Sequence, residues 1–339
     1  MENRPLCAKD VISRISEIGS LPQTLAAVLK TLNNQMSGAE EVAEVISKDV
    51  SLTFRVLRMV NSAQFGRRRK VTKISEAVVL MGLNSIKMLT LSSSVFGMVN
   101  DPELLRRCNI KRICRHLIET AINARSIAIE TKYKEPEEAF VGGILHDIGI
   151  ILMLLYFREK YLQVLDRMKA DQKGITQAEK DVFGLTHGEV GAEIINSWSL
   201  PPKLAFVVEN HHSPNATSMI PEEIELNNII ALADHLSLGP FDDYFPNVEE
   251  NIEFVQLVGR KLNLNNTATN KIRRDSIPES IKLAEYLELD IGDILDILSE
   301  ANNRLAELYF SLEKLYLEKQ KLQTLVNGEL IESTLESVQ

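Results

Sequence analysis

Apolar residues recur along most of the chain at three- and four-residue spacing, which is the pattern of amphipathic helices. In residues 21–34, LPQTLAAVLKTLNN, five such positions fall on one helical face: Leu21, Leu25, Val28, Leu29 and Leu32. Residues 37–49 predict a further helix capped by Ser37, and residues 51–65 predict one that ends at Gly66. Residues 74–99 predict two helices with a hinge near Gly82. Since no stretch alternates apolar and polar residues long enough to predict a strand, we expect an all-α fold.

The pattern tightens into heptads near the C-terminus, in a long helix predicted for residues 291–327. One heptad position carries Leu298, Leu305, Leu312 and Val326, and the other carries Ala301, Leu308, Leu315 and Leu322. Lys319 is the single polar residue on these two stripes. This spacing is typical of a parallel two-stranded coiled coil, and it predicts a homodimer. The alternative is an ordinary amphipathic helix packed on its own domain. Between the helices of the first 240 residues and this long helix, residues 241–290 predict looser helical structure, to which we assign no role.

Composition narrows the class of protein. A formal net charge of −9 argues against binding nucleic acid or an anionic membrane by bulk attraction. The basic loop of residues 66–73, with its RRRK cluster, could bind phosphate or belong to a helix-turn-helix motif, but a solvated loop explains it as well. The N-terminus has no apolar signal core, and no uncharged run reaches membrane-spanning length. Three scattered cysteines cannot form a closed set of disulfides. We expect a cytoplasmic protein.

Candidate chemistry comes from the order of histidine and aspartate residues. His146 and Asp147 stand side by side in the apolar run FVGGILHDIGIILM, where burying both costs several kcal/mol unless each finds a partner. The other members of the series fall on successive predicted helices or at their ends. The full series is His116, His146, Asp147, His187, His211, His212 and Asp234.

Imidazole nitrogens and carboxylate oxygens suit divalent zinc, iron, manganese or nickel. Seven ligands are enough for one or two ions, and Asp147 could bridge two of them. His146 and Asp147 are also the candidates for catalytic residues. We expect His235, which follows Asp234, to lie outside the cluster. Two metals close together would activate a water molecule and hold a phosphate group.

The same series resembles that of the HD superfamily of metal-dependent phosphohydrolases, and the surrounding sequence is similar to its HDOD (HD-related output domain) branch. The resemblance covers residues 15–240 and is carried by several segments: LPQTLAAVLKTL, ISKDVSLTFRVLRMVNSAQFG, ISEAVVLMGLNSIKMLTL, AFVGGILHDIGIILM, HGEVGAEIINSWSLPPKLAFVVENHH and IIALADHLS. The resemblance implies two helical lobes, residues 15–105 and an HD-like lobe of residues 106–240.

Differences from the sequences of active phosphodiesterases bear on whether this chain is an enzyme or a signalling module. Phosphodiesterases of the HD-GYP branch, which cleave cyclic di-GMP, read HDIGK, whereas Ile150 takes the place of the lysine here. HHSPNATSM lacks their GYP loop, and Arg112 stands where trinuclear members carry a carboxylate. The resemblance therefore implies a bacterial signal-transduction module, an output or adaptor protein that binds metal and protein partners. The alternative is a phosphohydrolase acting on a nucleotide or cyclic dinucleotide, so enzyme activity stays open. DNA binding is the weakest of the three hypotheses.

Overall fold

The computed structural model is helical throughout the residues that it describes, and no strand occurs among them. These are residues 11–14, 26–28, 30–31, 37–61, 70–98, 110–198, 200–237, 239, 248–287, 289–291, 316–317 and 319–320. The expected all-α fold is confirmed. The chain divides into two units, Met1–Ile291 and Gly292–Gln339. The RRRK cluster up to residue 69 and nearly all of the predicted coiled coil, residues 291–327, lie outside the described residues.

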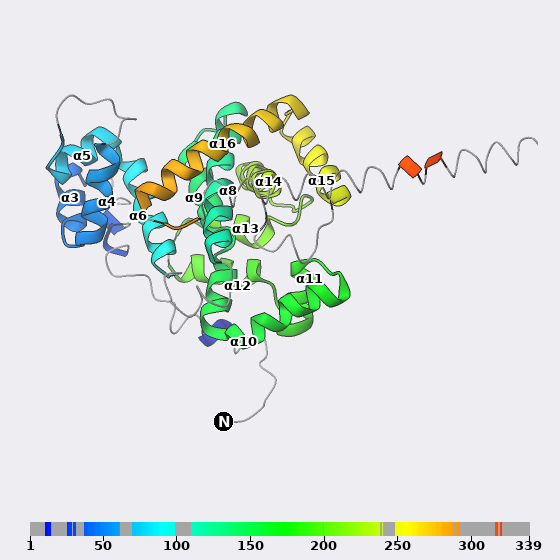
Figure 1. Ribbon diagram of the computed structural model, residues 1–339. Coiled ribbons are helices and arrows are strands. Elements are labelled where there is room, and N and C mark those ends of the chain that lie inside the picture. The colour runs from blue at the N-terminus through cyan, green and yellow to red at the C-terminus, as the bar shows by residue number, and fades with distance from the viewer. Residues whose placement is uncertain are drawn as a thin grey trace, which may run out of the picture. The chain divides into compact units, whose positions relative to one another are not determined.

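Four helices of the first unit form what we call the first lobe (Figure 1): α3 (Ala39–Ile46), α4 (Val50–Val60), α5 (Ile74–Met81) and α6 (Leu83–Met98). The predicted hinge is confirmed, because α5 and α6 are separated by Gly82 alone, whose φ of 79° suits glycine. Ser37 is not the cap of α3. The amide of Gly38 instead donates to Glu41 Oε2 at 2.9 Å, so α3 begins at Ala39.

Helix α4 ends earlier than the sequence predicts, at Val60. The reason is Asn61, whose side chain forms hydrogen bonds with the backbone of Val71. Its Nδ2 donates to Val71 O at 2.8 Å, and its Oδ1 accepts from Val71 N at 2.7 Å. These two hydrogen bonds hold the end of α4 beside the segment that leads into α5.

Seven helices make up the second lobe (Figure 1): α8 (Ile110–Glu130), α9 (Pro136–Leu145), α10 (Ile148–Asp171), α11 (Ile175–Phe183), α12 (His187–Ser197), α13 (Pro202–Asn210) and α14 (Pro221–Leu236). Helix α8 is central, since its residues are buried on all sides from Arg112 to Ala124. It packs against α9 and α14. Pro136–Asp171 is long and apolar enough to cross a membrane, yet 89% of its most apolar window is buried in the structure, as in a core helix.

Two glycines beside His146 and Asp147 let helices approach at backbone distance. A β-carbon at Gly143 would lie 2.5 Å from Ala121 Cα on α8, and one at Gly149 would lie 1.9 Å from the His187 carbonyl oxygen on α12. Real β-carbons do not come so close to backbone atoms. Glycine is therefore required at both positions, and the pair brings α8 and α12 to opposite ends of the turn between α9 and α10.

Residues 248–287 form two regular helices rather than a loose segment. These are α15 (Val248–Lys261) and α16 (Asn266–Leu287). Helix α15, yellow in Figure 1, packs on α14, and α16, orange in the same figure, packs along α8. A tight turn at Asn263, where φ is 56°, follows the end of α15 and leads to α16. The extension thus covers the outer face of the central helix of the second lobe.

Candidate metal centre

The structure brings all seven residues of the histidine–aspartate series into one cluster in the second lobe. His116 comes from the middle of α8, and Asp234 comes from the last turns of α14. The other five stand at helix ends. His146 and Asp147 are the only residues between α9 and α10, His187 begins α12, and His211 and His212 follow α13 directly. Helix α12 begins with a capping box formed by Thr186 and Glu189.

The first ligand group consists of His116, His146, Asp234 and the Oδ2 atom of Asp147. The Nε2 atoms of His116 and His146 lie 3.1 Å apart. Asp147 Oδ2 lies 3.5 Å from the first of these nitrogens and 3.4 Å from the second. Asp234 Oδ1 lies 3.2 Å from His116 Nε2. Four donor atoms from α8, the α9–α10 turn and α14 thus surround one point.

The second ligand group consists of His187, His211, His212 and the other oxygen of Asp147. His187 Nε2 lies 3.3 Å from His211 Nε2 and 3.1 Å from His212 Nε2. Asp147 Oδ1 lies 3.4 Å from His187 Nε2 and 3.5 Å from His211 Nε2. Asp147 therefore presents one carboxylate oxygen to each group, which is the arrangement of a ligand that bridges two ions.

Metal coordination accounts for the arrangement of these nitrogen and oxygen atoms better than hydrogen bonding among them does. Asp147 Oδ1 is buried and accepts no hydrogen bond. The Nδ1 atoms of His146 and His211 lie 2.8 Å from the carbonyl oxygens of Gly143 and Val208, so each carries its proton on Nδ1 and aims a lone pair from Nε2 into the cluster. Donor atoms on a metal about 2.1 Å away stand roughly 3.0–3.4 Å from one another in octahedral and tetrahedral sites. The separations in both groups fall in or near this range.

Each group also holds one imidazole with a raised pKa. Burial by itself lowers the pKa of His116, but the hydrogen bonds and charges of Asp147 and Asp234 raise it to about 10. Burial likewise lowers the pKa of His187, and the neighbouring carboxylate of Glu179 raises it to about 9. In the metal-free protein each ligand group thus attracts a proton, and that proton lies where a cation would bind.

A buried residue that the sequence did not single out orients His187. Glu179 Oε2 accepts from the backbone amide of His187 at 2.9 Å and lies 2.7 Å from its Nδ1. The other oxygen of Glu179 accepts from the hydroxyl of Tyr161 at 2.8 Å. A carboxylate behind a ligating imidazole fixes its tautomer and raises its basicity. No sequence signal marks Glu179, because its proximity to His187 depends on how α11 folds back onto α12.

His235, which was expected outside the cluster, belongs to neither ligand group, but it lies beside two of their members. A ring nitrogen of His235 lies within 4.8 Å of ligand atoms of His212 and Asp234, which makes a third candidate metal-binding group. Helix α15 is the reason, because it holds the His235 ring toward these residues: Phe254 stacks on the ring with centroids 3.7 Å apart, and Asn251 bonds to it.

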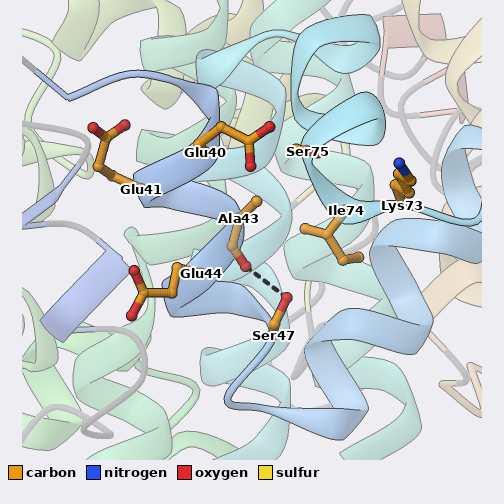
Figure 2. A pocket seen from close by; sticks show the side chains of 8 residues that line it. All are labelled: Glu40, Glu41, Ala43, Glu44, Ser47, Lys73, Ile74 and Ser75. Carbon is orange, nitrogen blue, oxygen red and sulfur yellow. Dashed lines mark hydrogen bonds between the residues drawn. The ribbon is translucent and has the colours of Figure 1, made fainter.

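The first lobe carries a separate surface pocket of about 620 Å³ between α3 and the start of α5. Figure 2 shows Glu40, Glu41 and Glu44 projecting from α3, with Lys73 beyond Ile74 and Ser75 on the other wall. None of the seven clustered residues lines this pocket. Its charged, open walls contrast with the buried histidines of the second lobe, so the metal-binding chemistry is confined to the second lobe among the described residues.

Comparisons with known proteins agree with this architecture. The family model of the HDOD domain matches residues 18–214. An uncharacterized protein of Treponema pallidum is 26% identical over 231 residues, which are 67% of this chain and 43% of that protein. The chain thus spans less than half the length of this curated relative, and 15% of the Bacillus subtilis protein YuxH.

Two solved structures share the fold. A candidate phosphohydrolase of Shewanella amazonensis superposes with a TM-score of 0.65 at 24% identity, covering 82% of this chain and 98% of that one. An HDOD domain protein of unknown function from Geobacter sulfurreducens superposes with a TM-score of 0.60 at 21% identity, covering 82% and 96%. At these identities the likeness concerns the fold.

Proposed function

The chain belongs to the HDOD domain family, and from that membership and the clustered ligands we propose a regulatory protein of bacterial signal transduction that holds two divalent transition-metal ions. The observation that carries the proposal is the carboxylate of Asp147, whose Oδ2 faces the first ligand group and whose Oδ1 faces the second. A buried carboxylate between five imidazoles is costly unless positive charge compensates it, which metal ions or protons on the imidazoles can supply. Iron, manganese, zinc and nickel all suit this mixture of nitrogen and oxygen donors.

The ligands on the chain's own helices would divide between the two ions. His116, His146 and Asp234 would hold one ion, and His187, His211 and His212 the other, with Asp147 shared between them. When bound, such a pair supplies Lewis acidity and an activated water molecule. Glu179 and the carbonyl oxygens of Gly143 and Val208 keep Nδ1 of three imidazoles protonated and Nε2 free to coordinate.

A regulatory role is favoured over catalysis because the third residue after Asp147 is not cationic. Ile150 is 1% exposed and apolar, whereas the active phosphodiesterases that the sequence resembles have a lysine there. Transition-state charge on a phosphate needs donors aimed at it, and an isoleucine side chain has none. Cytoplasmic location is part of the proposal, supported by the free thiol of Cys114.

The second candidate function is a metal-dependent phosphohydrolase acting on a nucleotide or cyclic dinucleotide. One observation favours it: the cluster is open on one side, where the side chain of His212 is 31% exposed and that of Asp234 is 12% exposed. A phosphate group could reach the ligands there. The likeness to the Shewanella candidate phosphohydrolase supports the fold that this activity would need.

One experiment separates the two candidates. The full chain is purified without added metal, and its metal content is measured beside hydrolysis of cyclic di-GMP and of a generic phosphodiester, with His146→Ala as the control. Two bound ions with slow or undetectable turnover support the regulatory protein. Robust metal-dependent turnover that His146→Ala abolishes moves the chain to the enzyme class. A protein that binds no transition metal under saturating conditions overturns both.

We further propose that the chain is a parallel homodimer held by the heptads between Leu298 and Val326, and that it signals to protein partners. The support is the sequence pattern, since two apolar stripes on a long helix would otherwise be exposed to solvent. Sedimentation of the full chain should give a dimer. Truncation before Ile291 should give a monomer that still folds and binds metal, and a monomeric full chain would refute this proposal.

A further inference from the structure

The exposed side of the cluster has a third set of donor atoms, which we call the rim group: His212, Asp234 and His235. Two of its members also belong to the ligand groups, and each of them has a second donor atom. Asp234 directs Oδ1 toward His116, and its Oδ2 lies 3.7 Å from His212 Nδ1. His212 in turn directs Nε2 toward His187. The outward atoms Oδ2 and Nδ1 thus remain for a partner at the rim.

His235 is hydrogen-bonded through Nδ1, as His146 and His211 are. Its Nδ1 lies 2.7 Å from Asn251 Oδ1, while Asn251 Nδ2 donates to the His235 carbonyl oxygen at 3.4 Å. The second bond fixes which end of the amide faces the ring, so Nδ1 of His235 is the donor and Nε2 keeps its lone pair. His146 and His211 show the same pattern with carbonyl acceptors. Phe254 holds the ring plane, with an angle of 16° between the two rings.

We propose that the rim group is a third cation position, built for a divalent transition metal and oriented by Asn251. The inference rests on the proposed two-ion centre, because it takes the outward atoms of residues whose inward atoms serve that centre. Coordination of His212 through both nitrogens breaks its remaining N–H bond and releases the proton to solvent, which leaves an imidazolate between two ions. Because deprotonating His212 costs free energy and the rim is exposed to solvent, the third ion is the weakest bound of the three.

A cation bound at the rim group would supply positive charge near His146 and Asp147. Three protein ligands leave open coordination positions, as they do in metal sites that bind a water molecule or a ligand oxygen. These positions face solvent on the side where His212 is 31% exposed. An anion such as a phosphate ester would meet the third ion first, in a site where Ile150 offers no cation.

The test is metal binding by the full chain in equilibrium dialysis against graded Mn²⁺, with the ratio of metal to protein measured by mass spectrometry. Wild type should bind three ions, two tightly and one weakly. His235→Phe keeps an aromatic ring against Phe254 and should bind only the two tight ions. Asn251→Leu should weaken the third ion by about 10–100-fold, and Asn251→Asp, which keeps an acceptor for Nδ1, should restore it. Melting temperatures measured in chelator show whether each variant folds as wild type does.

The outcomes separate this inference from the proposed function. Two ions in wild type, or a third ion that His235→Phe leaves unchanged, overturns the rim position and leaves the two-ion centre intact. No ions in wild type overturns both. Loss of all metal in His235→Phe with an unchanged melting temperature also overturns the inference, because His235 would then serve the inner groups.

Discussion

Gly149→Ala should separate the two helices that carry Asp147 and His187, and it should weaken both folding and metal binding. The added β-carbon would lie 1.9 Å from the His187 carbonyl oxygen, 2.7 Å from its carbonyl carbon and 3.0 Å from its Cα. All three are backbone atoms, so no side-chain rotation relieves the contact. Ordinary van der Waals contact begins near 3.4 Å, and α10 must therefore move away from the start of α12 by more than an ångström.

The cost follows from this displacement. Overpacking a core costs typically about 1–3 kcal/mol, and a clash with backbone belongs at the upper end. Alanine in a helix returns about 1 kcal/mol relative to glycine, so the net loss of unfolding free energy is about 2 kcal/mol. This corresponds to a fall in Tm of roughly 4–8 °C. Metal sites tolerate ligand displacements of about 0.2 Å, so the second ligand group should lose most of its affinity.

The assay is thermal unfolding with and without chelator, together with metal content after purification. Gly97→Ala is the matched control, because Gly97 lies on an exposed turn of α6 and a β-carbon there meets nothing within 4 Å. It should leave Tm unchanged or raise it slightly, with wild-type metal content. If Gly149→Ala melts and binds metal as Gly97→Ala does, the close approach of α10 to His187 is wrong.

Three further predictions concern the cluster itself. Asp147→Ala should lower Tm as chelation of wild type does, and chelating the variant should then change little; equal melting of wild type with and without its metal would count against a structural role for the ions. Glu179→Gln should weaken metal binding about 10–100-fold in titrations at alkaline pH. Tyr161→Phe removes the bond to the far oxygen of Glu179 and should leave the affinity near that of wild type. The metal-free protein should lose stability as pH rises from 6.5 toward about 10, because Asp147 and Asp234 raise the pKa of the buried His116 over that window and its proton is held only in the folded state. Added metal should stabilise more as pH rises through the same window, since ligation displaces that proton; melting curves near pH 6.5 and pH 9.5 with and without chelator check both, and a constant difference would contradict the reasoning.

The sequence predicts the parts of this fold that depend on short-range chemistry. The hinge at Gly82 follows from the backbone freedom of glycine and is confirmed. The start of α12 at Thr186 follows likewise from local capping preferences. The order of the histidines and aspartates predicted the residues that the structure brings together. It could do so because imidazole and carboxylate side chains can be identified as possible metal ligands from residue type alone.

Contacts between distant segments account for what the sequence did not predict. Glu179 reaches His187 only because α11 folds back, and Gly149 reveals its role only when α12 lies against it. Asn61 ended α4 early through a bond to Val71, a residue ten positions further along the chain. Periodicity describes one helix at a time and contains no information about such pairs.

At His235, a contact between distant segments that the sequence did not predict bears on function. From α14 alone it follows Asp234 by about 100° around the helix axis, which suggests that it faces away from the cluster. Asn251 and Phe254 on α15 hold the ring at the rim instead. Helix α15 leads into α16, which packs along α8, the helix that carries His116. The extension beyond the family-matched residues 18–214 therefore contacts both the rim group and the helix of the first ligand group. A change in metal occupancy at His235 would act on α15 directly, and this gives a regulatory protein a physical route from the metal centre to the rest of its chain.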